Sequence, residues 1–175
     1  MIAVAVQTPP RMRPCWERVS AGLDAARLAY VVMKNPPSVT RQAHCTAVLR
    51  ALGEKRASWA LRLEDDIVVP PNLLALLDAW IAREAFDIGW LYTWHDGYAP
   101  RGSQGVLVRG DRIGHLVRAC EALLPTSMPQ DSMLAHAAQL AGLRQARARP
   151  SVIEHLWDEP STCAIGRARS AVRAT

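Results

Sequence analysis

The stretch that decides the fold reads Ala60-Leu-Arg-Leu-Glu-Asp-Asp-Ile-Val-Val69 and continues into Pro70-Pro-Asn72. Its apolar first part predicts a buried strand. Because burying an unpaired carboxylate is costly, Glu64, Asp65 and Asp66 are expected where this strand emerges at the edge of a sheet. Side chains alternate along an extended chain, so Glu64 and Asp66 are expected on one face and Asp65 on the other. Two hard oxygen ligands at a strand end suit Mg²⁺ or Mn²⁺ carrying a diphosphate, whereas a solvated acidic turn is the plainer interpretation.

The chain has 175 residues, half of them hydrophobic, which is enough for one core and too few for two ordinary domains. We therefore predict one domain over residues 1–165 and a basic, mobile tail over residues 166–175. No apolar run reaches the length of a membrane span, so a cytoplasmic protein without a membrane span is expected. The net charge of +5 favours an anionic partner, either a nucleotide or a nucleic acid.

Apolar runs and helical stripes alternate along the chain, which predicts an α/β fold with a mostly parallel sheet and helices on both faces. Ser38 and Gly53 are the expected first and last positions of the second helix, and Asn72 is the expected cap of the third. Ligands of such sheets bind beyond the carboxyl ends of the strands, where the acidic triplet lies. The expected strands are 2–6, 29–33, 59–63, 87–92, 105–108 and 145–148, and the expected helices begin near 15, 38, 72, 111 and 131.

Three segments resemble parts of nucleotide-sugar-dependent glycosyltransferases of the GT-A type. Leu63-Glu-Asp-Asp-Ile-Val-Val-Pro-Pro-Asn72 resembles their Asp-x-Asp region, and Gly105-Val-Leu-Val-Arg-Gly-Asp111 resembles the segment beside the acceptor site. The third segment resembles the closing part of lipopolysaccharide-type and N-acetylglucosaminyl-type transferases, and it combines Pro129-Gln-Asp-Ser-Met-Leu134 with Pro150-Ser-Val-Ile-Glu-His155. Together the segments cover roughly residues 38–162. The resemblance implies a single-domain, Rossmann-like GT-A fold.

The resemblance also implies roles for individual residues. Asp66 would bind Mn²⁺ or Mg²⁺ directly, and His155 would be a second protein ligand of the metal. Glu64 or Asp65 would contact the donor ribose or the metal's waters. Asp131 would be the general base that takes the proton from the acceptor hydroxyl, if the enzyme inverts configuration. Each role has a plainer alternative, since Asp131 suits the first turn of a helix and a lone histidine such as His155 is often a hydrogen-bonded strand residue.

Two further groups are candidate contacts of the substrates. Residues near the first strand and the second helix are candidates for the nucleotide-sugar donor, although solvated arginines are the usual alternative. A loop rich in aromatic and polar residues, together with the strand after it, supplies candidates for the acceptor. The donor candidates are Thr8, Arg11 and Arg41, and the acceptor candidates are Trp94, His95, Asp96 and Gly105.

The leading interpretation is a metal-dependent hexosyl- or pentosyltransferase that moves a sugar from a nucleoside diphosphate to a hydroxyl. Basic charge and aromatic loop residues suit an acceptor such as a hydroxymethylated base in phage DNA, and the protein would then act in the host cytoplasm. A glycan such as lipopolysaccharide is the competing acceptor. Two other functions stay open: a nucleotidyltransferase using the same acidic strand end, and a nucleic-acid-binding module without activity.

Overall fold

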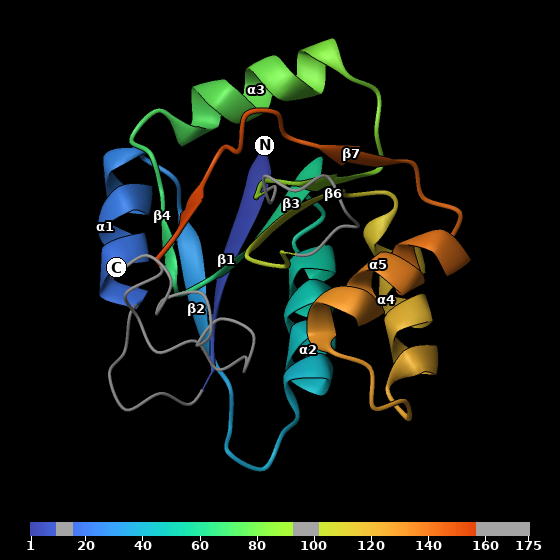
Figure 1. Ribbon diagram of the computed structural model, residues 1–175. Helices are drawn as coiled ribbons and strands as arrows, with labels where there is room; N and C mark the ends of the chain where they lie inside the picture. The colour runs from blue at the N-terminus through green and yellow to red at the C-terminus, as the bar shows by residue number, and fades with distance from the viewer. Residues whose placement is uncertain (10–15, 93–101, 157–175) are drawn as a thin grey trace, which may run out of the picture.

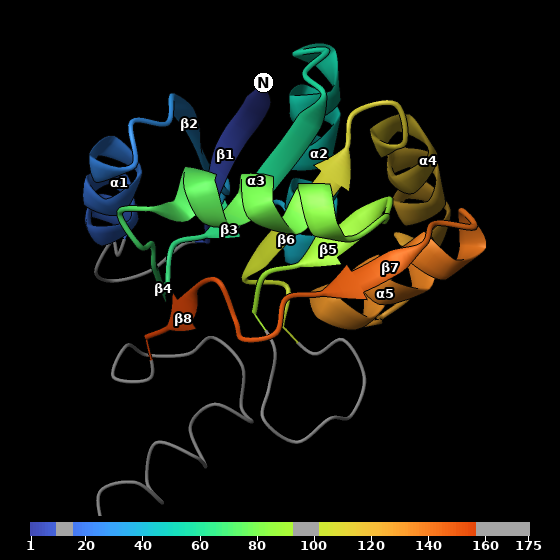
Figure 2. The same cartoon turned by 90° about the horizontal axis from the view of Figure 1, so that it is seen from above.

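A computed structural model describes residues 1–9, 16–92 and 102–156, and it shows a twisted sheet between two layers of helices (Figures 1 and 2). The main sheet has six strands in the order β2-β1-β3-β6-β5-β7. A second, two-stranded sheet pairs β4 with β8. The strands are β1 (Ile2–Thr8), β2 (Tyr30–Lys34), β3 (Trp59–Glu64), β4 (Ile67–Val68), β5 (Ile88–Trp90), β6 (Gly105–Arg109), β7 (Gln145–Arg147) and β8 (Glu154–His155). The helices are α1 (Trp16–Ala25), α2 (Arg41–Glu54), α3 (Leu73–Arg83), α4 (Ile113–Leu123) and α5 (Gln130–Leu140).

The strand directions confirm the predicted α/β fold with a mostly parallel sheet. Strand β1 runs parallel to both β2 and β3, and β5 runs parallel to β7. Strand β6 is antiparallel to both of its neighbours, β3 and β5. The carboxyl ends of β1, β2 and β3 therefore lie at one edge of the sheet, which is the edge where the predicted site should be.

Helices cover both faces of the sheet, as predicted, because alternate strand residues supply two separate hydrophobic cores. On one face, α2, α4 and α5 pack against residues such as Ala5, Ala60 and Val108. On the other face, α1 and α3 pack against residues such as Val6 and Leu61. No helix in the described part of the chain is both long enough and apolar enough to cross a membrane.

Two expected helix caps are corrected by the structure. Helix α2 is capped by Thr40, whose side chain accepts a hydrogen bond of 3.2 Å from the Ala43 backbone N–H, and not by Ser38. The same helix continues through Gly53, because the residues that follow keep helical geometry. Asn72 does precede α3, but its side chain makes no capping hydrogen bond. Residues 166–175, the predicted basic tail, lie outside the described residues.

Asp87, just before β5, is a buried carboxylate surrounded by three arginines. Its Oδ1 lies 3.2 Å from Arg109 Nη1 and 3.8 Å from Arg112 Nε. Its Oδ2 accepts hydrogen bonds from the backbone N and the Nε of Arg144, at 3.0 and 3.2 Å. Burial alone would raise the pKa of Asp87, but the hydrogen bonds from Arg144 and the charge of Arg109 hold that pKa below its ordinary value. Asp87 therefore ties the start of β5 to the end of β6, to the start of α4 and to the residue before β7.

We expect Asp87→Asn to lower the free energy of unfolding by about 1–3 kcal/mol at pH 7, because it removes the negative charge that three arginines face and replaces one of the two acceptor oxygens by an NH₂ group that can only donate. The folded-state pKa of Asp87 is depressed, so its contribution is present above the unfolded-state pKa of about 3.9 and is lost as pH falls through the folded-state value. Urea unfolding at pH 7 and at about pH 3 should therefore show a deficit that shrinks in acid. Asp111→Asn, which removes an exposed partner of the same Arg109, should change stability little. A deficit of equal size at both pH values would contradict this account.

Candidate active site

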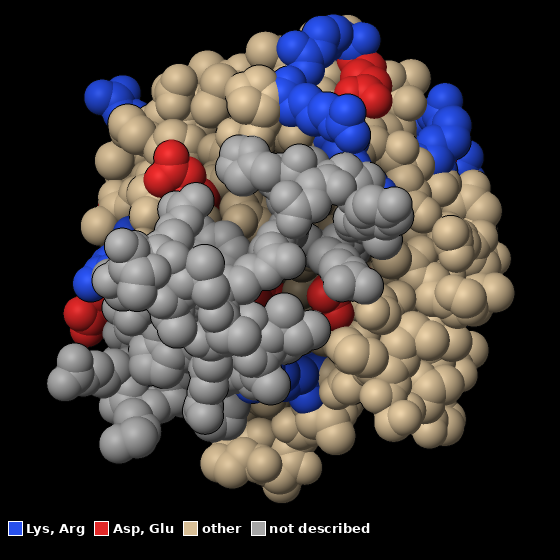
Figure 3. All heavy atoms as spheres, in the orientation of Figure 1, with Lys and Arg blue, Asp and Glu red and all other residues tan. Residues whose placement is uncertain are grey.

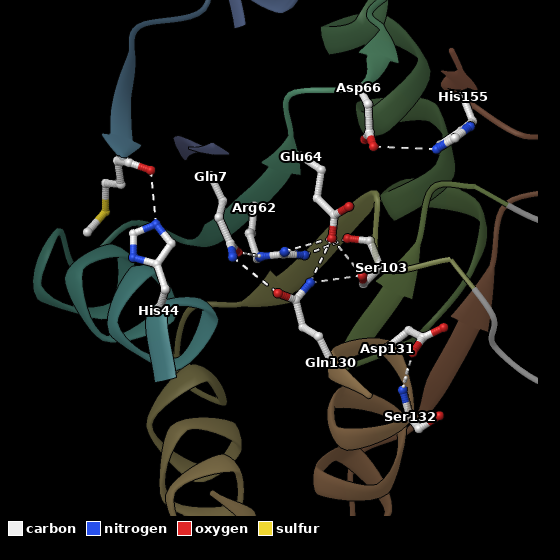
Figure 4. Close-up of polar contacts among 11 residues, drawn as sticks. Gln7, His44, Arg62, Glu64, Asp66, Ser103, Gln130, Asp131, Ser132 and His155 are labelled. Atoms are coloured by element: carbon white, nitrogen blue, oxygen red, sulfur yellow. Dashed lines mark hydrogen bonds and ion pairs between the residues drawn. The ribbon is translucent and has the colours of Figure 1, made fainter. Parts of the chain in front are cut away.

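Strand β8 places His155 beside Asp66 at the carboxyl edge of the sheet. Strands β4 and β8 pair antiparallel with Ile67 opposite His155, and the Leu156 backbone N–H donates to the Asp66 carbonyl at 2.9 Å. As a result His155 Nε2 lies 3.5 Å from Asp66 Oδ2, and both side chains are more than nine-tenths buried (Figure 4). The two residues predicted to bind the metal are thus side by side, although they are far apart in the sequence.

The side chains of Asp66 and His155 are suitable ligands for a divalent metal ion that also binds a second molecule. One carboxylate oxygen and one imidazole nitrogen are acceptable ligands of Mn²⁺, and Mg²⁺ is commonly held by one or two protein ligands with substrate phosphates and waters completing the shell. Among residues 1–9, 16–92 and 102–156, no group of three or more His, Cys, Asp and Glu side chains is arranged to hold a metal ion. The described residues therefore fit an open metal site, in which a bound anion and waters would supply the other ligands, better than a closed site made of protein ligands alone.

Glu64 ends strand β3 and is the acceptor at the centre of a hydrogen-bond cluster (Figure 4). Its Oε1 accepts from Arg62 Nη2 at 2.9 Å, from Ser103 Oγ at 2.7 Å and from Gln130 Nε2 at 2.7 Å. Gln7 on β1 completes the cluster, since its Oε1 accepts from Arg62 Nε at 2.6 Å and its Nε2 donates to Gln130 Oε1 at 3.1 Å. Four segments that are distant in the sequence therefore meet in this cluster, and three of them supply donors to the Glu64 carboxylate.

Arg62 is the buried cation of this cluster, with no exposed surface. Its guanidinium donates to Gln7, to the Ser103 carbonyl and to Glu64. Burial alone would lower the pKa of Arg62, but negative charge nearby, at neutral pH chiefly that of Glu64, raises it above its ordinary value. Arg62 therefore stays charged. Its positive charge offsets the free-energy cost of burying most of the Glu64 carboxylate.

The acidic triplet does not alternate as the sequence predicted. Strand β3 ends at Glu64, and the chain bends at Asp65 and Asp66 before β4 begins. Glu64 consequently faces the Arg62 and Gln130 cluster, while Asp66 faces His155 (Figure 4). Asp65 is fully buried. The prediction that Glu64 and Asp66 share a face is wrong, because the extended conformation on which it depends stops one residue too early.

Asp131 lies in the first turn of α5, half-buried and next to Gln130. Its Oδ1 accepts a hydrogen bond of 2.9 Å from the Ser132 backbone N–H. A carboxylate is favourable in the first turn of a helix, so this position by itself is compatible with a purely structural acid. The position also places Asp131 beside the residue that contacts Glu64, at the same edge of the sheet as Asp66.

No family model matches the sequence, and no curated protein sequence matches it. Several solved structures have the same fold. A glycosyltransferase involved in the glycosylation of the major capsid of PBCV-1 superposes with a TM-score of 0.66 at 10% identity, and the match covers 97% of this chain and 99% of that one. A mutant Drosophila beta-1,4-galactosyltransferase 7, in complex with manganese, UDP-Gal and xylobiose, gives 0.57 at 12% identity over 97% and 79% of the chains. A putative nucleotide-diphospho-sugar transferase from Desulfovibrio desulfuricans gives 0.54 at 8% identity over 83% and 79%.

The chain has a GT-A fold. The predicted fold class is thereby confirmed.

The structure places two of the residues predicted to contact the donor. In this GT-A sheet Thr8 ends β1 and is buried, and its carbonyl accepts from the Asn35 N–H at 2.8 Å. Arg41 begins α2 and is half-buried. Four further candidates, Arg11, Trp94, His95 and Asp96, lie outside the described residues.

Gly105 is a packing position of the GT-A sheet. It is buried at the start of β6, and a Cβ atom there would lie 2.6 Å from Ile153 Cδ1 and 3.1 Å from Leu91 Cβ. The close approach of these two side chains explains the glycine, so the predicted contact of Gly105 with an acceptor gains no support from its position.

Sequence reasoning missed the residues around Glu64. Arg62 carried a readable signal, because a charged residue two positions before Glu64 in an apolar strand must share its face. Gln130 precedes the predicted base, but nothing in the sequence connects it with β3. Gln7 and Ser103 carried no signal, since their roles depend on contacts between distant segments of the GT-A fold.

Proposed function

We propose that this protein is a metal-dependent glycosyltransferase that moves a sugar from a nucleoside diphosphate to an acceptor hydroxyl. The observation that carries the proposal is the 3.5 Å approach of His155 to Asp66 at the carboxyl edge of a GT-A sheet. The fold is shared with glycosyltransferases, one of them in complex with manganese and UDP-Gal. Nothing in the described part of the structure favours a nucleotidyltransferase or an inactive binding module over this function.

In this proposal each residue at the sheet edge has a separate role. Asp66 and His155 hold the ion, Mn²⁺ or Mg²⁺, which when bound neutralises the diphosphate leaving group. Glu64, which accepts a hydrogen bond from Arg62, contacts the donor ribose or the metal's waters. Asp131 takes the proton from the acceptor hydroxyl, which makes the reaction inverting.

For the acceptor, we favour a glycan or glycosylated protein over DNA. One protein of similar structure is involved in the glycosylation of the major capsid of PBCV-1, and another was solved in complex with xylobiose. On the face shown in Figure 3, the Lys and Arg side chains of the described residues lie in separate patches, with Asp and Glu between some of them. A nucleic acid is held by Lys and Arg side chains that cluster on one face or along a stripe. Hydroxymethylated DNA remains the competing acceptor, and the experiment below includes it.

The test measures release of nucleoside diphosphate from a panel of nucleotide sugars, with Mn²⁺, with Mg²⁺ and with EDTA. Each donor is assayed alone, with oligosaccharides, and with DNA containing hydroxymethylcytosine or hydroxymethyluracil. We expect metal-dependent release that rises with a glycan acceptor. A rise with modified DNA alone would transfer the proposal to that acceptor, and the absence of release from every donor would overturn the proposed activity.

We expect Asp66→Asn and His155→Ala each to lower kcat/KM by roughly 10–100-fold and to raise the Mn²⁺ concentration needed for half-maximal rate, because the first removes the charge of one proposed protein ligand and the second removes the other ligand. The matched controls are Asp78→Asn and His115→Ala, two exposed residues on α3 and α4. These controls should retain the parent's rate and metal dependence. Full activity of Asp66→Asn without any change in its Mn²⁺ requirement would contradict the assignment of the ligands.

A further inference from the structure

Gln130 makes three side-chain hydrogen bonds to three different parts of the fold. Its Nε2 donates to Glu64 Oε1 on β3 at 2.7 Å and to Ser103 Oγ, two residues before β6, at 3.0 Å. Its Oε1 accepts from Gln7 Nε2 on β1 at 3.1 Å. The carboxylate of Glu64 can only accept, so these partners hold the amide in one orientation. A half-turn of the amide would place two oxygens against each other.

These contacts matter because the start of α5 has no side-chain cap. Pro129 precedes the helix and makes no capping hydrogen bond. The segment before it is held from α2, where Gln42 Nε2 donates to the Met128 carbonyl at 2.8 Å. The hydrogen bond from Gln130 therefore links the first turn of α5 to the end of β3.

The two segments that Gln130 joins carry different halves of the proposed reaction. Glu64 is two residues before Asp66, which is paired with His155 in the proposed metal site. Asp131 is the next residue after Gln130 and is the proposed base. A displacement of about 1 Å between reacting groups can lower a rate by about 100-fold, so the length of this connection matters for the rate.

We propose that Gln130 is a positioning residue that sets the distance between Asp131 and the donor bound at Asp66. This inference depends on the proposed function. Gln130 acts through Asp131 and takes no proton itself. Its loss should therefore lower the rate of transfer much more than it weakens binding of the donor.

The decisive variant is Gln130→Met, which keeps the length and most of the volume of the side chain but removes all three hydrogen bonds. It is assayed with Mn²⁺ and the nucleotide sugar from which the parent releases most nucleoside diphosphate. We expect kcat to fall roughly tenfold or more, with a change in the donor KM of less than about threefold. Thermal unfolding of each variant shows whether the protein remains folded at the assay temperature. Gln145→Met is the matched control, since Gln145 on β7 makes one side-chain hydrogen bond, accepted from Trp90 Nε1 at 3.2 Å.

A second measurement separates positioning from general support of the fold. Gln130→Met is combined with Asp131→Asn, and because Gln130 acts through Asp131, it should change the residual rate by less than about twofold in that background. The same fold-loss in both backgrounds would overturn the inference, and so would a parent-like kcat for Gln130→Met in an active parent. An inactive parent would instead mean that the proposed function has failed, and the inference would fall with it.

Discussion

Arg62→Met should lower the free energy of unfolding by about 3–5 kcal/mol, because it removes the cation from a buried ion pair and leaves the carboxylate behind. Arg62 has no exposed surface, and its Nη2 lies 2.9 Å from Glu64 Oε1. Gln7 and the Ser103 carbonyl would lose their donor as well. Urea unfolding, with a shift of the midpoint at an unchanged slope, measures the loss.

Two further variants show whether the loss comes from the unpaired carboxylate. Arg62→Met combined with Glu64→Gln should be more stable than Arg62→Met alone, because no uncompensated charge then remains in the cluster. Arg50→Met is the surface control: Arg50 pairs with Glu121 between α2 and α4, and exposed pairs of this kind contribute about 1 kcal/mol or less. If the double variant were no more stable than Arg62→Met, the cost would lie in packing and not in the charge of Glu64.

The order and type of the elements were predictable because the signals are local. Apolar runs marked the six strands of the sheet, and stripes at helical spacing marked the five helices. The direction of β6 was also readable in principle. Parallel neighbours need a crossover, usually a helix, and none was expected between the strands at 87–92 and 105–108. The strand at 105–108 therefore has to run antiparallel to the strand at 87–92 if the two are neighbours.

The site was predictable only in part, because its geometry depends on pairings between distant segments. That Asp66 and His155 lie close together was predicted from a family resemblance. No periodicity in the sequence indicates it. It exists because β4 and β8, two strands of two residues each, pair at Ile67 and His155. The cluster around Glu64 requires β3, the start of β6 and the start of α5 to meet, which no single stretch of sequence encodes.

Asp131→Asn should lower kcat by roughly 10²–10⁴-fold, the usual contribution of a general base, with little change in the KM of the donor. The substitution is nearly isosteric, and the side-chain oxygen of asparagine can still accept the hydrogen bond from the Ser132 N–H. The amide cannot take a proton from an acceptor hydroxyl. The measurement is the steady-state rate of transfer with Mn²⁺, together with the anomeric configuration of the product by NMR, which should be inverted in the parent.

The alternative role of Asp131 predicts a different result. A carboxylate in the first turn of α5 interacts favourably with the helix dipole, and its neutralisation would cost at most about 1 kcal/mol of stability at an exposed or half-exposed position. Under that role Asp131→Asn would unfold at a slightly lower temperature and keep the parent's kcat. Gln139→Ala, on the exposed end of the same helix, controls for general effects on α5. A large loss of kcat in a variant of nearly unchanged stability therefore assigns Asp131 to the chemistry, because a purely structural acid would change these two quantities in the opposite proportion.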